Sequence, residues 1–426
     1  MRTGLPPALV PSRRLPWPKR VDVALLCFVA LVIAYCDRVN LSVAAPTLLR
    51  EYGWDTAQLG WAFTGFFIGY TGFMIPVGRL TDRLGPRRMF AISILWWSLF
   101  TALTPLPTSL AAMVAVRILM GLGESGVFPA MNSVLVRWFP QQEYSRVTGF
   151  CWSGGYAGSI VAFPVASAIL SVWGWRAIFY VFAFLGLVWL PFWWLGARDR
   201  PEESAAVGRD EMAYIVASRP SLPKVETVPW GRLLGLAPLW AVWILHFSSN
   251  WFAYVMITWL PTYLANERGF SLTNMAFGSA APFVCALAGT NLFGSLMDRL
   301  TKGHNRTAVR KAFLVPYALS AAVLLAVPLA PGPATTVAAL CIAMFLLTAV
   351  TPVYASSSLD IAPRYAGTVV GLQSAIANVA GILAPVVIGY LVKGFGWPSA
   401  FWLTAAVSAA GIVVFLAFGN AERLVD

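Results

Sequence analysis

The stretch Gly78 to Arg88 reads GRLTDRLGPRR, and a variant of its first seven residues, GSLMDRL, returns from Gly294 to Leu300, at an offset of 216 residues. A second echo pairs WGWRAIFY (Trp173 to Tyr180) with FGWPSAFW (Phe395 to Trp402), at an offset of 222 residues. Because the two echoes occur in the same order along the chain, they indicate a duplication. We therefore expect two halves of the same design.

The sequence around these motifs is strongly apolar. Of 426 residues, 58% are hydrophobic and only 11% are charged, which is not the composition of a soluble protein. A bilayer core about 30 Å thick needs roughly 20 apolar residues for each helical crossing. Twelve such stretches predict an all-α membrane protein with two six-helix, pseudo-symmetric halves: 21–47, 57–80, 88–106, 110–137, 145–170, 176–197, 236–265, 273–298, 310–330, 334–359, 366–391 and 397–419.

Polar segments divide the chain into five parts. They are a tail (1–20), an N-terminal bundle (21–197), a linker (198–235), a C-terminal bundle (236–419) and a second tail (420–426). The first tail lacks the short apolar core and small-residue cleavage site of a signal peptide. Inside the linker, Arg209 to Ser218 is expected to form a short surface helix between prolines.

The net charge of +12 indicates topology rather than a nucleic-acid partner, because the basic residues are spread over alternate loops instead of forming one patch. The opposite side of the bilayer carries only Arg50, Arg176, Arg268 and Lys393. The positive-inside rule then places both termini in the cytoplasm. We expect a multi-pass protein of the plasma (inner) membrane that functions as a monomer in the lipid bilayer.

Four charged residues lie at depth in the predicted helices: Asp37 and Arg38 in the first, Arg117 and Glu124 in the fourth. Each costs on the order of 2.5 to 3.5 kcal/mol to insert, so such residues usually face a bundle interior or a water-filled cavity. Arg117 and Glu124 share a helix face, whereas about 100° of rotation separates Asp37 from Arg38. Two acids and two arginines are also compatible with buried ion pairs that only join helices, and both interpretations stay open.

Other helices offer polar or aromatic side chains that could contact a solute, although each alone is more often a hydrogen bond between helices. These candidates are Tyr70, Trp152, His246, Ser248 to Asn250, Trp251, Tyr254, Ser356, Ser357, Ser358, Gln373 and Asn378. The repeated loop motif predicts a gate whose charges form and break contacts between the halves. Its members are Gly78, Asp82, Arg83, Arg87, Asp298 and Arg299, with plain positive-inside bias as the alternative.

Some motifs are missing from the sequence. It contains no phosphate-binding loop for ATP, no Ser/His/Asp arrangement and no spaced Cys/His set for a metal. The five cysteines all fall in predicted helices, without a C-x-x-C pair. We therefore expect no cofactor, no metal and no enzymatic activity, and a gradient as the source of energy.

The sequence resembles the anion:cation symporter branch of the major facilitator superfamily over nearly its whole length. The loop Gly78 to Arg88 carries the superfamily resemblance. The branch is suggested by YCDRVNLSVAAP (Tyr35 to Pro46), RILMGLGESGVFP (Arg117 to Pro129), WLPTYL (Trp259 to Leu264) and GLQSAIANVAGILAP (Gly371 to Pro385).

This resemblance implies roles for individual residues. Asp37 and Glu124 would carry protons, Arg117 would tune Glu124, Arg38 would bind the substrate carboxylate, and Tyr70 and Asn378 would contact the substrate. The fifth helix departs from the pattern, because sugar-acid carriers of the branch place a glutamine where this chain reads FCWSGGYAG (Phe150 to Gly158). That departure favours a less hydroxylated, even aromatic, substrate.

We therefore expect proton-coupled uptake of a small organic anion, such as a sugar acid or another carboxylate, by alternating access. A sodium-coupled or uncoupled anion carrier is the first alternative. A receptor or enzyme built on the same fold is the second, and the duplicated halves disfavour it.

Overall fold

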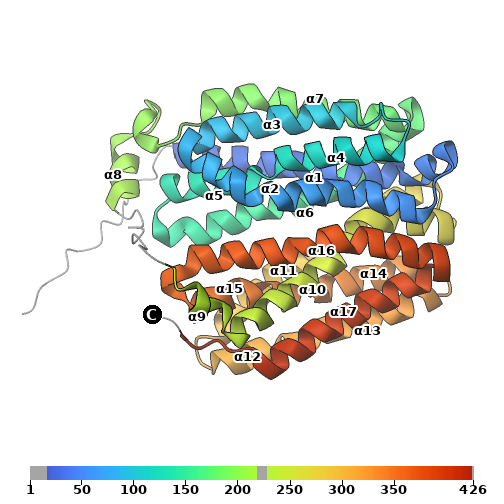
Figure 1. Ribbon diagram of the computed structural model, residues 1–426. Helices are drawn as coiled ribbons and strands as arrows, with labels where there is room; N and C mark the ends of the chain where they lie inside the picture. The colour runs from blue at the N-terminus through green and yellow to red at the C-terminus, as the bar shows by residue number, and fades with distance from the viewer. Residues whose placement is uncertain (1–16, 218–227, 425–426) are drawn as a thin grey trace, which may run out of the picture.

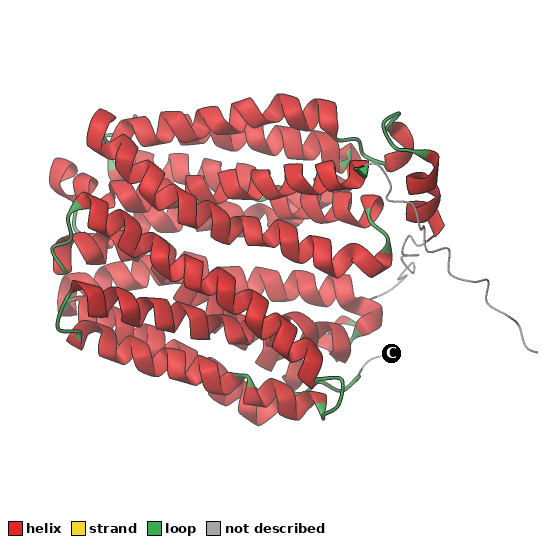
Figure 2. Ribbon diagram, turned by 180° about the vertical axis from the view of Figure 1, so that it is seen from behind, coloured by secondary structure: helices red, strands yellow, loops and turns green. Residues whose placement is uncertain are grey.

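The computed structural model describes residues 17–217 and 228–424, and every regular element in these ranges is a helix (Figure 2). The N-terminal half contains six bilayer-length segments, the fourth of them made of two helices in succession. Their bounds are α1 (Lys19–Tyr52), α2 (Thr56–Leu84), α3 (Pro86–Leu103), α4 (Leu110–Glu124) with α5 (Val127–Trp138), α6 (Gln141–Trp173) and α7 (Trp175–Gly196).

The C-terminal half repeats this plan with six further segments, several of them assembled from shorter pieces. Their bounds are α10 (Ala237–Thr262) with the π-helical η2 (Tyr263–Glu267), α11 (Leu272–Leu300), α12 (Arg306–Ala312) with α13 (Leu314–Ala326) and η3 (Val327–Leu329), α14 (Pro333–Leu347) with η4 (Thr348–Val350) and α15 (Thr351–Ile361), η5 (Pro363–Tyr365) with α16 (Ala366–Phe395), and α17 (Trp397–Phe418). Eight segments are by themselves long and apolar enough to cross a membrane. The prediction of twelve helical segments in two halves is confirmed.

The linker adds η1 (Pro201–Glu203), α8 (Arg209–Ala217) and α9 (Trp230–Leu234). The predicted surface helix is thus present as α8, while its last expected residue, Ser218, lies outside the described residues, as do residues 1–16 of the first tail and 425–426 of the second. The Glu211 carboxylate of α8 accepts the backbone N–H groups of Lys19 and Arg20 at 3.0 and 3.1 Å. It satisfies two of the free N–H groups that begin α1.

The fourth segment was predicted as one helix over 110–137, and it is interrupted at Ser125 and Gly126. A Cβ atom on Gly126 would lie 2.2 Å from the Ser93 hydroxyl of α3, so only glycine permits this approach. The Ser125 hydroxyl donates to the Leu122 carbonyl at 2.6 Å instead of to solvent. The interruption makes Glu124 the last residue of α4, deep in the bundle.

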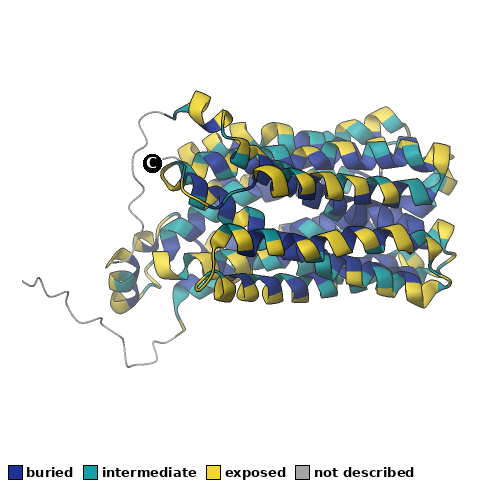
Figure 3. Cartoon of the chain, turned by 90° about the horizontal axis from the view of Figure 1, so that it is seen from below, coloured by how far each residue is buried: buried dark blue, intermediate teal, exposed yellow. Residues whose placement is uncertain are grey.

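Exposed residues lie along the outside of the bundle, while buried residues lie in its interior (Figure 3). In Figure 1 the N-terminal half lies above the C-terminal half, and both described chain ends lie with α8 on the left. We call this the linker end and the opposite one the far end. The two halves meet along α2 and α16, along α6 and α11, and between α1 and α10.

At the far end, α2 approaches the backbone of α16 closely. The Thr56 hydroxyl donates to the Gly389 carbonyl at 2.8 Å and the Thr64 hydroxyl to the Ile382 carbonyl at 2.9 Å. A Cβ on Gly60 would lie 2.7 Å from the Pro385 carbonyl oxygen. Small residues allow helices to approach closely within a membrane, and here they bring α2 against α16.

At the linker end, glycines of four helices lie next to open space: α2, α6, α11 and α16. A Cβ added to Gly78 of α2, Gly149 of α6, Gly294 of α11 or Gly371 of α16 would meet no atom within 4 Å. All four glycines lie toward the linker end of their helices, and two of them begin the repeated motif. The halves are therefore tightly packed at the far end and loosely packed at the linker end.

Candidate functional site

The central feature of the N-terminal half is a buried ion pair between α1 and α4. The Nε atom of Arg38 donates to Oε1 of Glu124 at 2.5 Å. Arg38 is only 4% exposed and Glu124 only 1%. Removing one partner of such a pair leaves an uncompensated buried charge, which typically costs about 3 to 5 kcal/mol. Any event that separates the two groups must therefore supply a replacement for the lost charge.

Aromatic rings surround the other faces of the Arg38 guanidinium. Its carbon lies 4.6 Å from the ring centroid of Tyr70, 4.8 Å from that of Tyr35 and 5.2 Å from that of Phe66. Tyr254 of the C-terminal half lies within electrostatic range of the same guanidinium. Aromatic faces attract cations, by about 0.5 to 2 kcal/mol for each ring. The cage holds Arg38 at the contact between the halves.

Asp37 points elsewhere, because neighbouring helix positions differ by about 100°. It is wholly buried inside the N-terminal half, where its Oδ2 accepts a hydrogen bond from Nε1 of Trp97 of α3 at 3.1 Å. Its Oδ1 has no hydrogen-bond partner in the described part of the chain. Asp37 and Arg38 are therefore adjacent in sequence but belong to different surroundings.

Arg117 connects these two surroundings electrostatically. It lies within range of both Asp37 and Glu124, and its guanidinium carbon is 5.1 Å from the centroid of Phe66. Among the described residues its Nε has no hydrogen-bond partner, and its Nη1 contacts Sδ of Met120 at 3.1 Å. The four charges sum to zero, so the resting arrangement is electrically balanced.

In the C-terminal half, Tyr254 of α10 and Asn378 of α16 lie together. The Tyr254 hydroxyl donates to the Asn378 side-chain oxygen at 2.5 Å, and the Asn378 amide nitrogen donates to the Ser374 carbonyl at 2.8 Å. The Tyr254 ring packs against that of Phe67 in α2, with centroids 4.5 Å apart. The structure thus brings Tyr70, Tyr254 and Asn378 to the contact between the halves, near Arg38.

Gln373 belongs to a different network. Its side-chain oxygen accepts from the Ser358 hydroxyl at 2.5 Å, and its amide nitrogen lies 3.0 Å from Nδ1 of His246. The His246 ring stacks on that of Tyr354, with centroids 3.9 Å apart. Ser357 is fully buried, and its hydroxyl donates to the Val353 carbonyl of its own helix at 2.7 Å. In this conformation the polar atoms of Gln373 and Ser357 are occupied by protein partners.

Trp152 lies on α6, one turn closer to the linker end than Tyr156. Tyr156 lies within side-chain hydrogen-bonding range of Thr290 of α11, so this face of α6 points toward the C-terminal half. Trp152 is 48% exposed and packs edge-to-face on Phe128 at 5.6 Å. It lies on the approach from the linker end rather than in the Arg38 cage.

The predicted gate residues all lie at the linker end. Asp82, Arg83, Asp298 and Arg299 are exposed, and within residues 17–217 and 228–424 none of them forms an ion pair. Arg87 instead turns back onto the N-terminal half. It donates to the Trp194 carbonyl at 2.5 Å and lies 4.2 Å from the centroid of the Trp194 indole.

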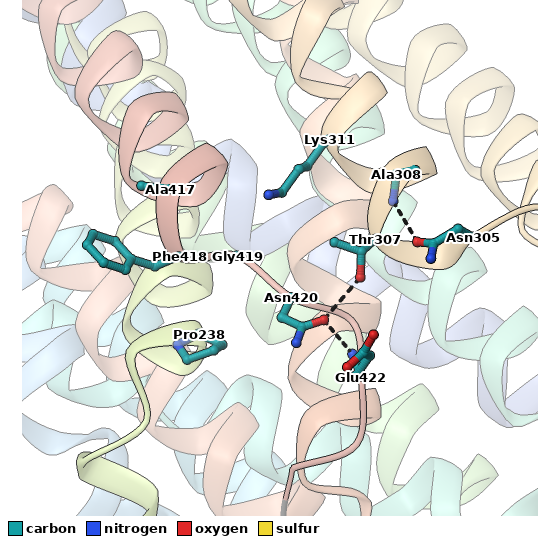
Figure 4. A pocket seen from close by; sticks show the side chains of 10 residues that line it. All are labelled: Pro238, Asn305, Thr307, Ala308, Lys311, Ala417, Phe418, Gly419, Asn420 and Glu422. Carbon is teal, nitrogen blue, oxygen red and sulfur yellow. Dashed lines mark hydrogen bonds between the residues drawn. The ribbon is translucent and has the colours of Figure 1, made fainter.

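A hollow of about 580 Å³ lies at the linker end of the C-terminal half, between α10, α12 and α17 (Figure 4). Most of its polar side chains already have hydrogen-bond partners within the protein. The Thr307 hydroxyl donates to the Asn420 oxygen at 3.1 Å, and Asn305 accepts from the Ala308 amide at 3.0 Å. It lies apart from the buried charges, so it is not the candidate site.

Sequence reasoning identified Tyr70 and Tyr254 but missed the other two aromatic rings around Arg38, those of Tyr35 and Phe66. Tyr35 precedes Arg38 by three positions and Phe66 precedes Tyr70 by four, which places each pair on one helix face. This spacing could have identified both residues. The position of Trp97 against Asp37 depends on helix packing, and no local signal predicts it.

Comparison with known proteins shows the family. The model of the Major Facilitator Superfamily matches residues 27–385 and 304–424. The sodium-dependent phosphate transport protein 1, chloroplastic, of Arabidopsis thaliana is 33% identical over 97% of this chain and 82% of its own length. A probable sulfoacetate transporter of Cupriavidus necator is 32% identical over 92% of this chain and 92% of its own length.

A solved structure agrees in fold. The bacterial homologue of the human lysosomal transporter Spinster, in an inward-facing and occupied conformation, superposes with a TM-score of 0.76 at 18% identity. The match covers 94% of this chain and 97% of the other. The expected resemblance to the anion:cation symporter branch is likewise confirmed by the anion-transporting relatives. The chain therefore belongs to the Major Facilitator Superfamily of membrane transporters.

Proposed function

We propose that this transporter is a symporter that takes up a small organic anion together with protons by alternating access. The observation that carries the proposal is the Arg38–Glu124 pair. An arginine fork matches a carboxylate, and this one is buried, ringed by aromatic faces and directed toward the C-terminal half. The relatives named for phosphate and sulfoacetate support an anionic cargo.

The coupling follows from charge balance. In the resting state the carboxylates of Asp37 and Glu124 neutralise Arg38 and Arg117. Protonation of Glu124 releases Arg38, and a substrate anion then restores neutrality. A carrier loaded with only the proton or only the anion would keep an uncompensated buried charge, and that state resists closure. Each added negative charge on the substrate therefore requires one more proton, for which Asp37 is the second acceptor.

The packing of the halves supports alternating access. The far end is closed along α2 and α16, and the four glycines of the linker end face open space. If the linker end is cytoplasmic, as the distribution of basic residues predicts, this conformation faces inward. We propose that both termini are cytoplasmic, that the protein lies in the plasma (inner) membrane, and that the monomer suffices for transport.

Four of the gate residues are exposed and form no ion pair within the described ranges, which fits an open gate at the linker end: Asp82, Arg83, Asp298 and Arg299. We propose that Asp82, Arg83 and the Asp298–Arg299 pair engage the opposite half when this end closes. Gly78 permits that approach because it carries no side chain. Arg87, held by the Trp194 carbonyl, would have to release that contact to take part.

Uptake into proteoliposomes under an imposed proton gradient tests the proposal. Candidate probes are benzoate, gluconate, sulfoacetate and phosphate. Glu124→Gln and Asp37→Asn should abolish accumulation against a gradient, whereas Glu143→Gln, a carboxylate that pairs with Arg20 at the linker end at 3.1 Å, should preserve it. Intact gradient-driven accumulation in both site variants would refute the proton assignment.

Sodium coupling is the second candidate, favoured by the relative named as sodium-dependent. Replacing sodium with choline in the same assay distinguishes the two. Proton coupling predicts uptake that survives this replacement and follows the proton gradient. Equilibration without accumulation under either gradient would indicate an uncoupled carrier.

A further inference from the structure

One of the contacts between the halves runs along α6 and α11, and it keeps one register over several turns (Figure 1). The Phe163 ring of α6 packs against the Phe283 ring of α11, with centroids 5.6 Å apart. Seven residues nearer the linker end on both helices, Tyr156 lies within side-chain hydrogen-bonding range of Thr290. Because seven residues are nearly two turns, each helix uses the same face at both contacts. The two helices therefore run antiparallel and in step.

The next turn of this register places Trp152 of α6 opposite Gly294 of α11. Each lies four positions beyond the last contact, on the same face of its helix. A Cβ atom added to Gly294 would meet no atom of the described residues within 4 Å, so the helices have separated at this level. The Trp152 indole packs instead on Phe128 of its own half, and Trp152 is 48% exposed. A large aromatic side chain thus lies across from an unfilled space on the other half.

The contact between α2 and α16 ends differently at the linker end. The Thr71 hydroxyl donates to the Asn378 carbonyl at 3.4 Å. Seven residues nearer the linker end on each helix lie Gly78 and Gly371, both beside open space. Two glycines allow helix backbones to approach closely within a membrane. This contact can therefore close by direct helix packing, whereas the contact between α6 and α11 must accommodate an indole.

Trp152 also lies on the linker side of the Arg38 cage. A Cβ atom on Gly155 would lie 2.9 Å from the ring of Tyr35, whose centroid is 4.8 Å from the Arg38 guanidinium carbon. Trp152 is three residues, or nearly one turn, nearer the linker end on the same helix as Gly155. An indole that moved onto α11 at this level would cover the path from the linker end to Arg38.

We propose that Trp152 is a gating residue of the linker end, and that its indole leaves Phe128 and packs onto Gly294 when the halves close there. The inference rests on the proposed function, because it requires alternating access. It gives Trp152 a role in occluding the substrate in place of the substrate contact expected from the sequence. Packing on α11 removes ring surface from solvent, which favours the closed state. Gly294 leaves the space that the ring needs, because any side chain at this position would occupy it.

Spin-label distances across the linker end, measured in proteoliposomes without added substrate, test the gate. The labels are attached through Ser145→Cys at the start of α6 and Lys302→Cys just after α11, at two exposed positions. The chain without these substitutions corrects for labelling of the five native cysteines. The protein with Trp152 and Gly294 intact should show a long and a short distance, for the open and the closed linker end.

Gly294→Leu should lower both the short-distance population and the uptake rate by about tenfold or more, because leucine overpacks the closed contact with the indole. The variant should still fold, since the open conformation has room for the new side chain. Adding Trp152→Ala to Gly294→Leu should restore the short distance and uptake, because the indole no longer competes for the space. Gly72→Leu, the same substitution at an exposed α2 glycine with open space beside it, is the matched control and should behave as wild type.

Three results would overturn the gate: a short-distance population that Gly294→Leu does not change, no recovery when Trp152→Ala is added, or wild-type distances that stay long with and without benzoate, gluconate, sulfoacetate and phosphate. Weaker anion binding by Trp152→Ala with unchanged distances would also overturn it, because the indole would then be a substrate contact. The proposed symport fails separately. If the distances respond as expected but none of the four anions accumulates under a proton gradient, the gate stands and the symport assignment is wrong.

Discussion

Replacing Glu124 with glutamine removes the carboxylate that competes with the substrate for Arg38. In the wild-type protein an anion must displace a charge-assisted hydrogen bond of 2.5 Å, and such bonds contribute about 1.5 to 3 kcal/mol. Without that competitor, anion affinity at neutral pH should rise by roughly 10-fold to 100-fold, since each 1.4 kcal/mol is tenfold. The cation remains stabilised by three aromatic rings, so the cage should persist.

The same substitution should change the pH dependence of binding and the stability. Wild-type anion affinity should increase as the pH falls and Glu124 gains a proton, whereas the Glu124→Gln variant should bind with an affinity nearly independent of pH. In the absence of anion the variant should lose on the order of 3 kcal/mol of stability, because the Arg38 cation is left unpaired. Accumulation driven by a proton gradient should disappear while anion exchange continues.

The assay is titration of purified protein with whichever of benzoate, gluconate, sulfoacetate and phosphate gives the largest thermal shift, at pH 5.5 and pH 8. The Glu143→Gln variant is the control, since that carboxylate lies at the linker end with Arg20. If Glu124→Gln retains the wild-type pH dependence, or binds the anion more weakly, Glu124 is not the competitor and the coupling scheme is refuted.

Two further predictions concern the far end. Lys393→Ala removes a 2.8 Å ion pair with Asp55 across the halves. The two side chains are 56% and 36% exposed, so solvent screens the pair and spin-label distances should shift only modestly toward far-end opening. The hydrogen bond from Lys393 and those from the α2 backbone hold the pKa of Asp55 below its usual value despite partial burial. The contribution should therefore persist at neutral pH and disappear as the pH falls below about 4, and a shift unaffected by acid would contradict this. Gly60→Leu places side-chain atoms where the Pro385 carbonyl lies 2.7 Å from a Cβ, and it should prevent far-end closure and stop transport. Gly72→Leu, the same substitution at an α2 glycine with open space beside it, is the matched control, and equal transport rates in the two variants would show that close packing at Gly60 is dispensable.

Tertiary packing changes the interpretation of several residues that the sequence grouped together. Asp37 and Glu124 were both predicted to carry protons. Asp37, however, is directed away from the other half and bonds to Trp97, whereas Glu124 pairs with Arg38, the arginine proposed to bind the substrate. Gln373 was predicted to face the solute, and its side chain is held by Ser358 and His246. Their roles as coupling and substrate residues remain predictions.

The sequence by itself determined the twelve segments, the duplication and the four buried charges. Within lipid, a spanning segment must satisfy its backbone hydrogen bonds internally, so an apolar run of sufficient length specifies a helix without reference to the rest of the chain. The cost of inserting charges makes Asp37, Arg38, Arg117 and Glu124 conspicuous for the same local reason.

Only the tertiary structure decided which groups meet. Asp37 and Arg38 are adjacent in the sequence, but the helical rotation between them sends one toward α3 and the other toward α4 and the opposite half. The break after Glu124 lies beside the close approach of Gly126 to Ser93, a contact between different helices. Such pairings follow from how helices pack against one another, and the residue pattern of a single helix does not specify which helices will be its neighbours.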